Sequence, residues 1–202
     1  MAYSDFNITK VRETFGLTVE EPADLFSAIN PLSPSQYLQT TLSENVTLAN
    51  AINTEKARSE LIIAPVLLEV RRQFNFQIGF FSGIEFNVES ETGLTGYCDY
   101  ILTASPYKFE IRTPILTLVE AKNENIKAGL GQCIAEMVAA QKVNQREGNA
   151  INTIEGAVTT GTDWKFLQLS ASTVFIDSKD YYINEIERIL GILSEPFKPF
   201  VR

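Results

Sequence analysis

The sequence predicts an α/β domain in which a central mixed β-sheet is flanked by helices. Two observations lead to this prediction. Residues 115–122 begin with a run that is apolar apart from Thr117 and ends at Glu120, which is typical of a strand covered on both faces. The segment that follows, 127–145, repeats apolar residues at spacings of three and four, which indicates a helix packed directly on that sheet.

The chain length of 202 residues and a hydrophobic content of 45% favour one compact domain. Residues 1–52 contain turn residues and a cap signal at Ser35, and they predict an N-terminal helical extension packed on the core. The core is then expected over residues 53–202. Its first element is a long helix over 53–74, capped at Asn53 or Thr54 and kinked at Pro65.

The remaining elements follow from local patterns. Two stretches rich in aromatic and β-branched residues, 76–89 and 94–103, are separated by the turn signal "SETG" and predict a hairpin. After the strand at 115–122 and its helix, residues 154–177 predict two or three more strands. The apolar spacing in 180–193 predicts a closing amphipathic helix capped by Asp180. The order is therefore helix, three strands, helix, strands, helix.

The composition excludes several kinds of chemistry. The chain has no histidine, so Ser-His and Cys-His catalysis and histidine general bases are absent. Catalysis would have to rest on carboxylates, lysine, hydroxyls or a hard metal bound through oxygen. The two cysteines, Cys98 and Cys133, lack metal-site spacing, and we expect both to be small buried residues in a reducing compartment.

A formal net charge of −8 without any basic run argues against a broad nucleic-acid footprint. It does not exclude a nuclease, because an acidic cluster that binds Mg²⁺ is negative until the metal arrives. The longest apolar stretch, 61–68, is too short to span a bilayer, and the first residues do not form a secretory signal. We therefore expect a cytoplasmic protein without a membrane partner.

Four charged residues form the candidate site. Glu120 and Lys122 are two apart in a strand, so their side chains project to the same side. Asp99 is a lone acid inside the apolar, aromatic strand of the hairpin, and Glu60 is followed on the 53–74 helix by apolar residues three, four and seven positions later. A buried carboxylate must be paired, neutralised or metal-bound. The alternative is that Glu120 and Lys122 pair at a solvated strand end for less than about 1 kcal/mol, and that water reaches Asp99.

Asp99, a gap of twenty residues and Glu120-Ala121-Lys122 at a strand end, followed by a helix, together resemble the PD-(D/E)XK nuclease superfamily. The resemblance covers about residues 53–177 and implies a restriction-endonuclease-like core with the order αβββαβ. It implies that Glu60 is the acid that many members carry on the first core helix. It also implies that Gln132 is the glutamine that related branches carry near the site. The superfamily's motif proline is replaced here by Cys98.

The resemblance implies a nuclease that depends on Mg²⁺ or Mn²⁺ and hydrolyses phosphodiester bonds, with DNA the favoured substrate. Asp99, Glu120 and the backbone carbonyl of Ala121 would bind the metal through oxygen. Glu60 would hold a metal-bound water or a second ion. We expect Lys122 to have a lowered pKa and to stabilise charge on the phosphate, and Gln132 to position the lysine or a phosphate oxygen.

Other interpretations stay open. An inactive nuclease-like scaffold that serves as a binding or assembly module would suit the negative charge. A homo-oligomer, or a partner protein that supplies a basic surface, is compatible with the sequence. Trp164 is expected in the strand core rather than as a base-stacking platform, and "GLGQ" at 129–132 as a helix start rather than a phosphate loop. Lys127 is expected in a solvated loop, with a phosphate contact as the alternative.

Overall fold

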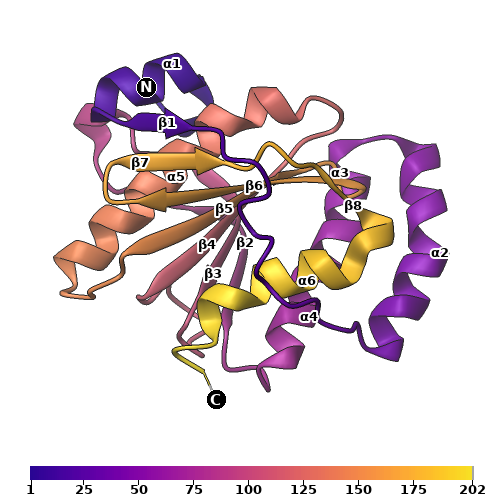
Figure 1. The fold of residues 1–202 in the computed structure, drawn as a ribbon. Coiled ribbons are helices and arrows are strands. Elements are labelled where there is room, and N and C mark those ends of the chain that lie inside the picture. Colours follow the sequence, from indigo (N-terminus) through magenta and orange to yellow (C-terminus); the bar gives the residue numbers. More distant parts are fainter. Residues whose placement is uncertain (202) are drawn as a thin grey trace.

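The computed structural model describes residues 1–201 and shows a mixed eight-stranded sheet with helices on both faces, which confirms the predicted α/β class (Figure 1). The elements, in chain order within each kind, are the helices α1 (Ile8–Phe15), α2 (Gln36–Ile52), α3 (Glu55–Arg58), α4 (Ala64–Gln73), α5 (Ile126–Arg146) and α6 (Ile186–Ser194), and the strands β1 (Thr18–Glu20), β2 (Gly79–Glu85), β3 (Tyr97–Thr103), β4 (Ile115–Ala121), β5 (Thr153–Thr159), β6 (Asp163–Ser170), β7 (Thr173–Ile176) and β8 (Tyr181–Tyr182).

The strands lie in the order β1-β7-β6-β5-β4-β3-β2, and β8 pairs with β6. The predicted hairpin is confirmed as the antiparallel pair β2–β3, and β3 is antiparallel to β4. The pair β4–β5 is parallel, with α5 as the crossover between them. All seven residues of β4 are buried, as expected for a strand covered on both faces.

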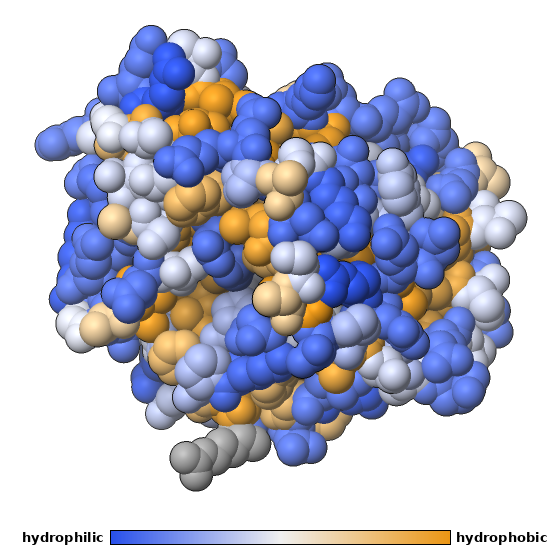
Figure 2. Space-filling view, viewed as in Figure 1, coloured by the Kyte–Doolittle hydropathy of each residue, from blue (hydrophilic) through white to orange (hydrophobic). Residues whose placement is uncertain are grey.

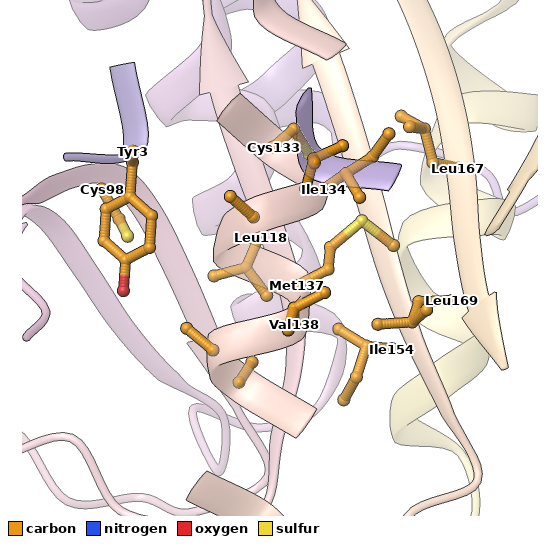
Figure 3. Close-up of a cluster of buried hydrophobic side chains, with 14 of the residues drawn as sticks. Tyr3, Cys98, Leu118, Cys133, Ile134, Met137, Val138, Ile154, Leu167 and Leu169 are labelled. Carbon is orange, nitrogen blue, oxygen red and sulfur yellow. The ribbon is translucent and has the colours of Figure 1, made fainter. Parts of the chain in front are cut away.

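Each face of the sheet has its own apolar core. On one face, α5 packs Cys133, Ile134 and Met137 against strand residues such as Leu118 and Ile154 (Figure 3). On the other face, α4 and α6 cover the strands, and the buried side chains there are those of Leu67, Val70, Leu190, Val119 and Trp164. Trp164 is fully buried and donates its indole N–H to the Gly161 carbonyl at 3.0 Å, so its expected place in the strand core is confirmed.

The helix expected over 53–74 is interrupted. Thr54 caps α3 by accepting from the Ala57 N–H at 3.1 Å, and a π-helical turn, Ser59–Ile63, separates α3 from α4. Pro65 lacks the N–H that would bond to the Leu61 carbonyl in an α-helix, and that carbonyl accepts instead from Asn45 Nδ2 of α2 at 3.2 Å. The irregularity expected at Pro65 therefore lies in the turn that precedes it.

Two local expectations are wrong. The sequence predicted only helices and turns in the first 52 residues, but Thr18–Glu20 forms an edge strand parallel to β7. Asp180 does not cap the last helix, because the residues after it form β8 and a 3₁₀ turn, and α6 starts only at Ile186. The Asp180 carboxylate instead accepts from Lys165 Nζ at 2.5 Å.

The surface is predominantly hydrophilic on the face shown in Figure 2, and apolar side chains are scattered over it in small patches. Within residues 1–201 no helix combines the length and apolar character needed to cross a membrane. Cys98 and Cys133 are both buried, as expected, and neither forms a disulfide bond.

Candidate active site

The ends of β3 and β4 bring Asp99 and Glu120 together. The last paired residues of the two strands are Tyr100 and Val119, so the next position in that register places Asp99 opposite Glu120. The Ala121 N–H, which lies beyond the ladder, donates to Asp99 Oδ2 at 2.8 Å. Asp99 therefore closes the end of the ladder beside Glu120.

Glu120 is a buried carboxylate that is only half satisfied. Its side chain is 2% exposed, and its Oε1 accepts from Lys122 Nζ at 2.5 Å. Its Oε2 is buried without a hydrogen-bond partner among the described residues. Burial and the charge of Asp99 raise the pKa of Glu120 to about 8, against the opposing effect of Lys122. A second cation would relieve the repulsion between the two acids.

The position of Lys122 depends on α5. Asn125 caps this helix by accepting from the Ala128 N–H at 3.2 Å, so "GLGQ" lies in its first turns, and the expected helix start is confirmed. A Cβ at Gly129 would lie 3.1 Å from Lys122 Cε, so glycine leaves the room that the lysine stem occupies. Gln132, one turn later, accepts from Lys122 Nζ through Oε1 at 3.5 Å.

The expected lowering of the Lys122 pKa is wrong for this structure. Burial is the largest single effect and lowers the pKa of Lys122, but the charge of Glu120 and its hydrogen bond together outweigh burial and raise it. Lys122 is therefore an ammonium group held by a carboxylate, suited to stabilising negative charge rather than to accepting a proton.

Glu60 lies near the site but not on an apolar face. Its side chain is 63% exposed and pairs with Lys56 at 3.3 Å. The expectation assumed α-helical phase, whereas Glu60 belongs to the π turn, which shifts the phase of the residues that follow. Glu60 nevertheless lines a pocket of about 330 Å³ whose lining also includes Asp99 and Ala121. Of the five side chains predicted for the site, Glu120, Lys122 and Gln132 are therefore joined by hydrogen bonds, and Asp99 lies opposite Glu120 in the strand register. Glu60 lines the neighbouring pocket.

Sequence reasoning missed Glu136. It lies one turn after Gln132 on α5, is completely buried, and accepts from Gln132 Nε2 through Oε1 at 3.1 Å. Burial and the charge of Glu120 raise the pKa of Glu136. The signal in the sequence was an acid four positions after the glutamine, which places the two on the same face of the helix.

A larger pocket of about 560 Å³ begins directly after the motif, at residues 123–127. It contains three cations. Lys165 is paired with Asp180, while Arg58 donates to the uncharged oxygens of Thr160 and Asn53. Lys127 is exposed as expected, but it lies in the first turn of α5 and not in a loop, at the end where the helix dipole is positive. The lining also contains three acids, Glu124, Asp163 and Asp180, so the formal charges of this pocket balance; among the described residues Arg58 and Lys127 form no ion pair.

The donor set suits a hard cation that takes few ligands from the protein and completes its coordination with water. No group of three or more His, Cys, Asp or Glu side chains in residues 1–201 is arranged to hold a metal ion. Mg²⁺ characteristically uses one or two carboxylates and keeps several waters, so Asp99, Glu120 with its unpartnered Oε2, and the Ala121 carbonyl fit that ion. Comparisons of this chain with models of known protein families and with curated proteins find no match. The functional conclusion therefore rests on the residues and their geometry.

Proposed function

We propose that this protein is a Mg²⁺- or Mn²⁺-dependent nuclease that hydrolyses phosphodiester bonds, and that residues 53–202 form a restriction-endonuclease-like core. The observation that carries the proposal is the pair of facing acids, Asp99 and Glu120, with the Lys122 ammonium bonded to one of them. The adjoining strands bring these groups together although they are far apart along the chain.

The order of elements supports the proposed core. The interrupted helix α3–α4 is followed by β2, β3 and β4, then by α5 and β5, which is the order αβββαβ. The parallel pair β4–β5, joined by α5, places the end of β4 and the start of α5 at the same edge of the sheet. The facing acids and Lys122 lie at this edge.

Each side chain has a distinct role in the proposal. Asp99, Glu120 and the Ala121 carbonyl would hold the divalent ion, which when bound polarises the phosphate and lowers the pKa of a water molecule. Lys122 stabilises the negative charge that develops on the phosphate oxygens. Gln132 keeps the lysine in place. Glu60, at the pocket edge, orients water from the helix side.

The distribution of charge limits how the protein can contact a nucleic acid. A net charge of −8 leaves little basic surface, so contact with nucleic acid is local. Arg58, Lys127 and the amino end of α5 line the 560 Å³ pocket beside the acids, and they suit phosphates that flank the scissile one. We propose DNA as the substrate, with RNA as the competing outcome of the test.

The test measures cleavage of single-stranded DNA, duplex DNA and RNA in Mg²⁺ and in Mn²⁺. Lys122→Met keeps most of the side-chain volume but removes the positive charge. Asp99→Asn removes the negative charge of a carboxylate that would bind the metal. Lys108→Met, in the exposed loop between β3 and β4, is the matched control. We expect loss of cleavage in the first two variants only. An inert native protein that also binds no divalent ion by calorimetry would refute the proposal.

The second candidate is an inactive scaffold that binds a partner. The negative charge favours it, as does the engagement of Lys122 by Glu120, which occupies an acid that a metal would need. Calorimetry separates the two: a scaffold would give no Mg²⁺-binding heat in the native protein, whereas the nuclease would give a heat that Asp99→Asn abolishes.

A further inference from the structure

Glu136 is a fully buried acid within an apolar cluster. Its helix neighbours Cys133 and Ala140 are buried in the same core. Its charge helps to raise the pKa of the buried Tyr3 and Cys98, after the larger effect of their burial. Tyr3 directs its own hydroxyl to the Phe86 carbonyl at 2.7 Å, so it does not bond to this carboxyl group. An acid in such a place is costly to bury unless it is hydrogen-bonded.

The carboxyl group of Glu136 makes fewer hydrogen bonds than a buried carboxyl group needs. Only Oε1 is bonded, to Gln132 Nε2 at 3.1 Å, and Oε2 is buried with no partner in the described part of the chain. An apolar side chain of similar volume would fill the same space without that cost. Core packing alone therefore does not account for an acid at this position.

The hydrogen bonds lead from Glu136 to the candidate active site. Gln132 donates from its NH₂ group to Glu136 and accepts through its Oε1 from Lys122 Nζ at 3.5 Å, and Lys122 Nζ donates to Glu120 Oε1 at 2.5 Å. An ammonium group only donates, so the reversed amide would place two donors face to face. An acceptor beneath Gln132 therefore selects the amide orientation that receives the lysine.

We propose that Glu136 is a positioning residue of the nuclease site: it fixes the Gln132 amide and, through it, the Lys122 ammonium beside the scissile phosphate. This inference rests on the proposed function. Glu136 itself is fully buried and touches neither substrate nor metal. Its role is to hold a second residue in one of two otherwise similar orientations.

Three variants and one double variant test this inference. Glu136→Met removes the acceptor and keeps the volume, Glu136→Gln keeps an acceptor oxygen, and Gln132→Met removes the intermediate amide. We expect Glu136→Met and Gln132→Met each to lower kcat on DNA by about 10- to 100-fold at saturating metal, with KM nearly unchanged. The double variant should lose no more than the worse single variant, because both act through one contact. Glu136→Gln should restore most of the rate.

Stability separates positioning from a structural role. Glu136→Met should unfold at the same temperature as the native protein or higher, because an acid with an unbonded oxygen leaves the core. Loss of rate together with equal or greater stability supports positioning. The positioning role is overturned if Glu136→Met and Glu136→Gln lose rate equally and both also lose stability. It is also overturned if the rate losses of the two single variants multiply in the double variant.

A crystal structure of Glu136→Met gives a readout that does not depend on cleavage. We expect the Gln132 side chain to leave Lys122 in this variant and to stay in Glu136→Gln. If Gln132 keeps its contact in Glu136→Met, the positioning role is refuted whether or not the protein is a nuclease. If native protein cleaves no substrate but Gln132 moves as expected, the proposed function fails while the inference about orientation stands.

Discussion

Gly129 is where the packing of α5 bears most directly on the candidate site. A methyl group at this position would lie 2.7 Å from Val158 Cγ1 and 3.1 Å and 3.2 Å from Lys122 Cε and Cγ. Ordinary carbon contacts are about 3.5–4.0 Å, so Gly129→Ala must displace the lysine stem or the helix by about 0.5–1 Å. Alanine gains about 1 kcal/mol of helix propensity, and overpacking costs about 1–3 kcal/mol. We therefore expect a net destabilisation of at most about 2 kcal/mol.

The effect on activity should exceed the effect on stability. A displacement of about 1 Å at a catalytic group can cost about 100-fold in rate. Under the proposed nuclease function, Gly129→Ala should therefore lower kcat on DNA by about 10- to 100-fold while the protein stays folded. Thermal unfolding and cleavage kinetics on the same preparation measure both quantities. Gly156→Ala is the matched control, because its methyl group would press on Met137 Sδ at 2.4 Å in the core and not on Lys122. A folded Gly129→Ala variant with native kcat would refute the assigned position of Lys122.

Three further predictions concern stability. Burial raises the pKa of Glu155 from 4.5 to about 7. The contribution of Glu155 to the free energy of unfolding is therefore greatest below pH 4.5 and falls as the pH rises to 7, by at most about 3 kcal/mol. Glu155→Gln should remove this part of the pH dependence of urea unfolding, and an unchanged pH profile would contradict the assignment. Thr54→Ala removes the cap of α3 and should cost about 1 kcal/mol in urea unfolding, whereas Thr54→Ser should cost little. Mg²⁺ at 100 times its dissociation constant should stabilise the native protein by about 2.7 kcal/mol, and in Asp99→Asn the same concentration should give a much smaller rise in Tm; equal rises would place the ion elsewhere.

The sequence predicted the central strand, its helix and the residues at their junction because these signals are long and local. The apolar run before Glu120 defined β4, and the spacing of apolar residues in 127–145 defined α5. Once those two elements were in place, Glu120, Lys122 and Gln132 had to lie near one another. Asp99 joined them because the hairpin strand β3 pairs with β4.

The features that were missed depend on contacts or on departures from regular geometry. The π turn at Ser59–Ile63 changes the helical phase, so the spacing of apolar residues after Glu60 did not report its environment. Strand β1 has only three residues, too few for alternation to be visible. Glu136 reads as an ordinary helix acid in the sequence, and only the packing of α5 against the sheet reveals that it is buried.

The bond between Asn45 and the Leu61 carbonyl has a practical meaning for anyone who shortens this chain. Ser35 likewise donates both its N–H and its hydroxyl to the buried carboxylate of Glu69 on α4, at 2.8 Å each. A fragment beginning at residue 53 would therefore leave the Leu61 carbonyl without this partner, and the Glu69 carboxylate with only Gln73 and Arg72 as partners. Deleting the first 52 residues would thus disturb the π turn that carries Glu60 beside the 330 Å³ pocket.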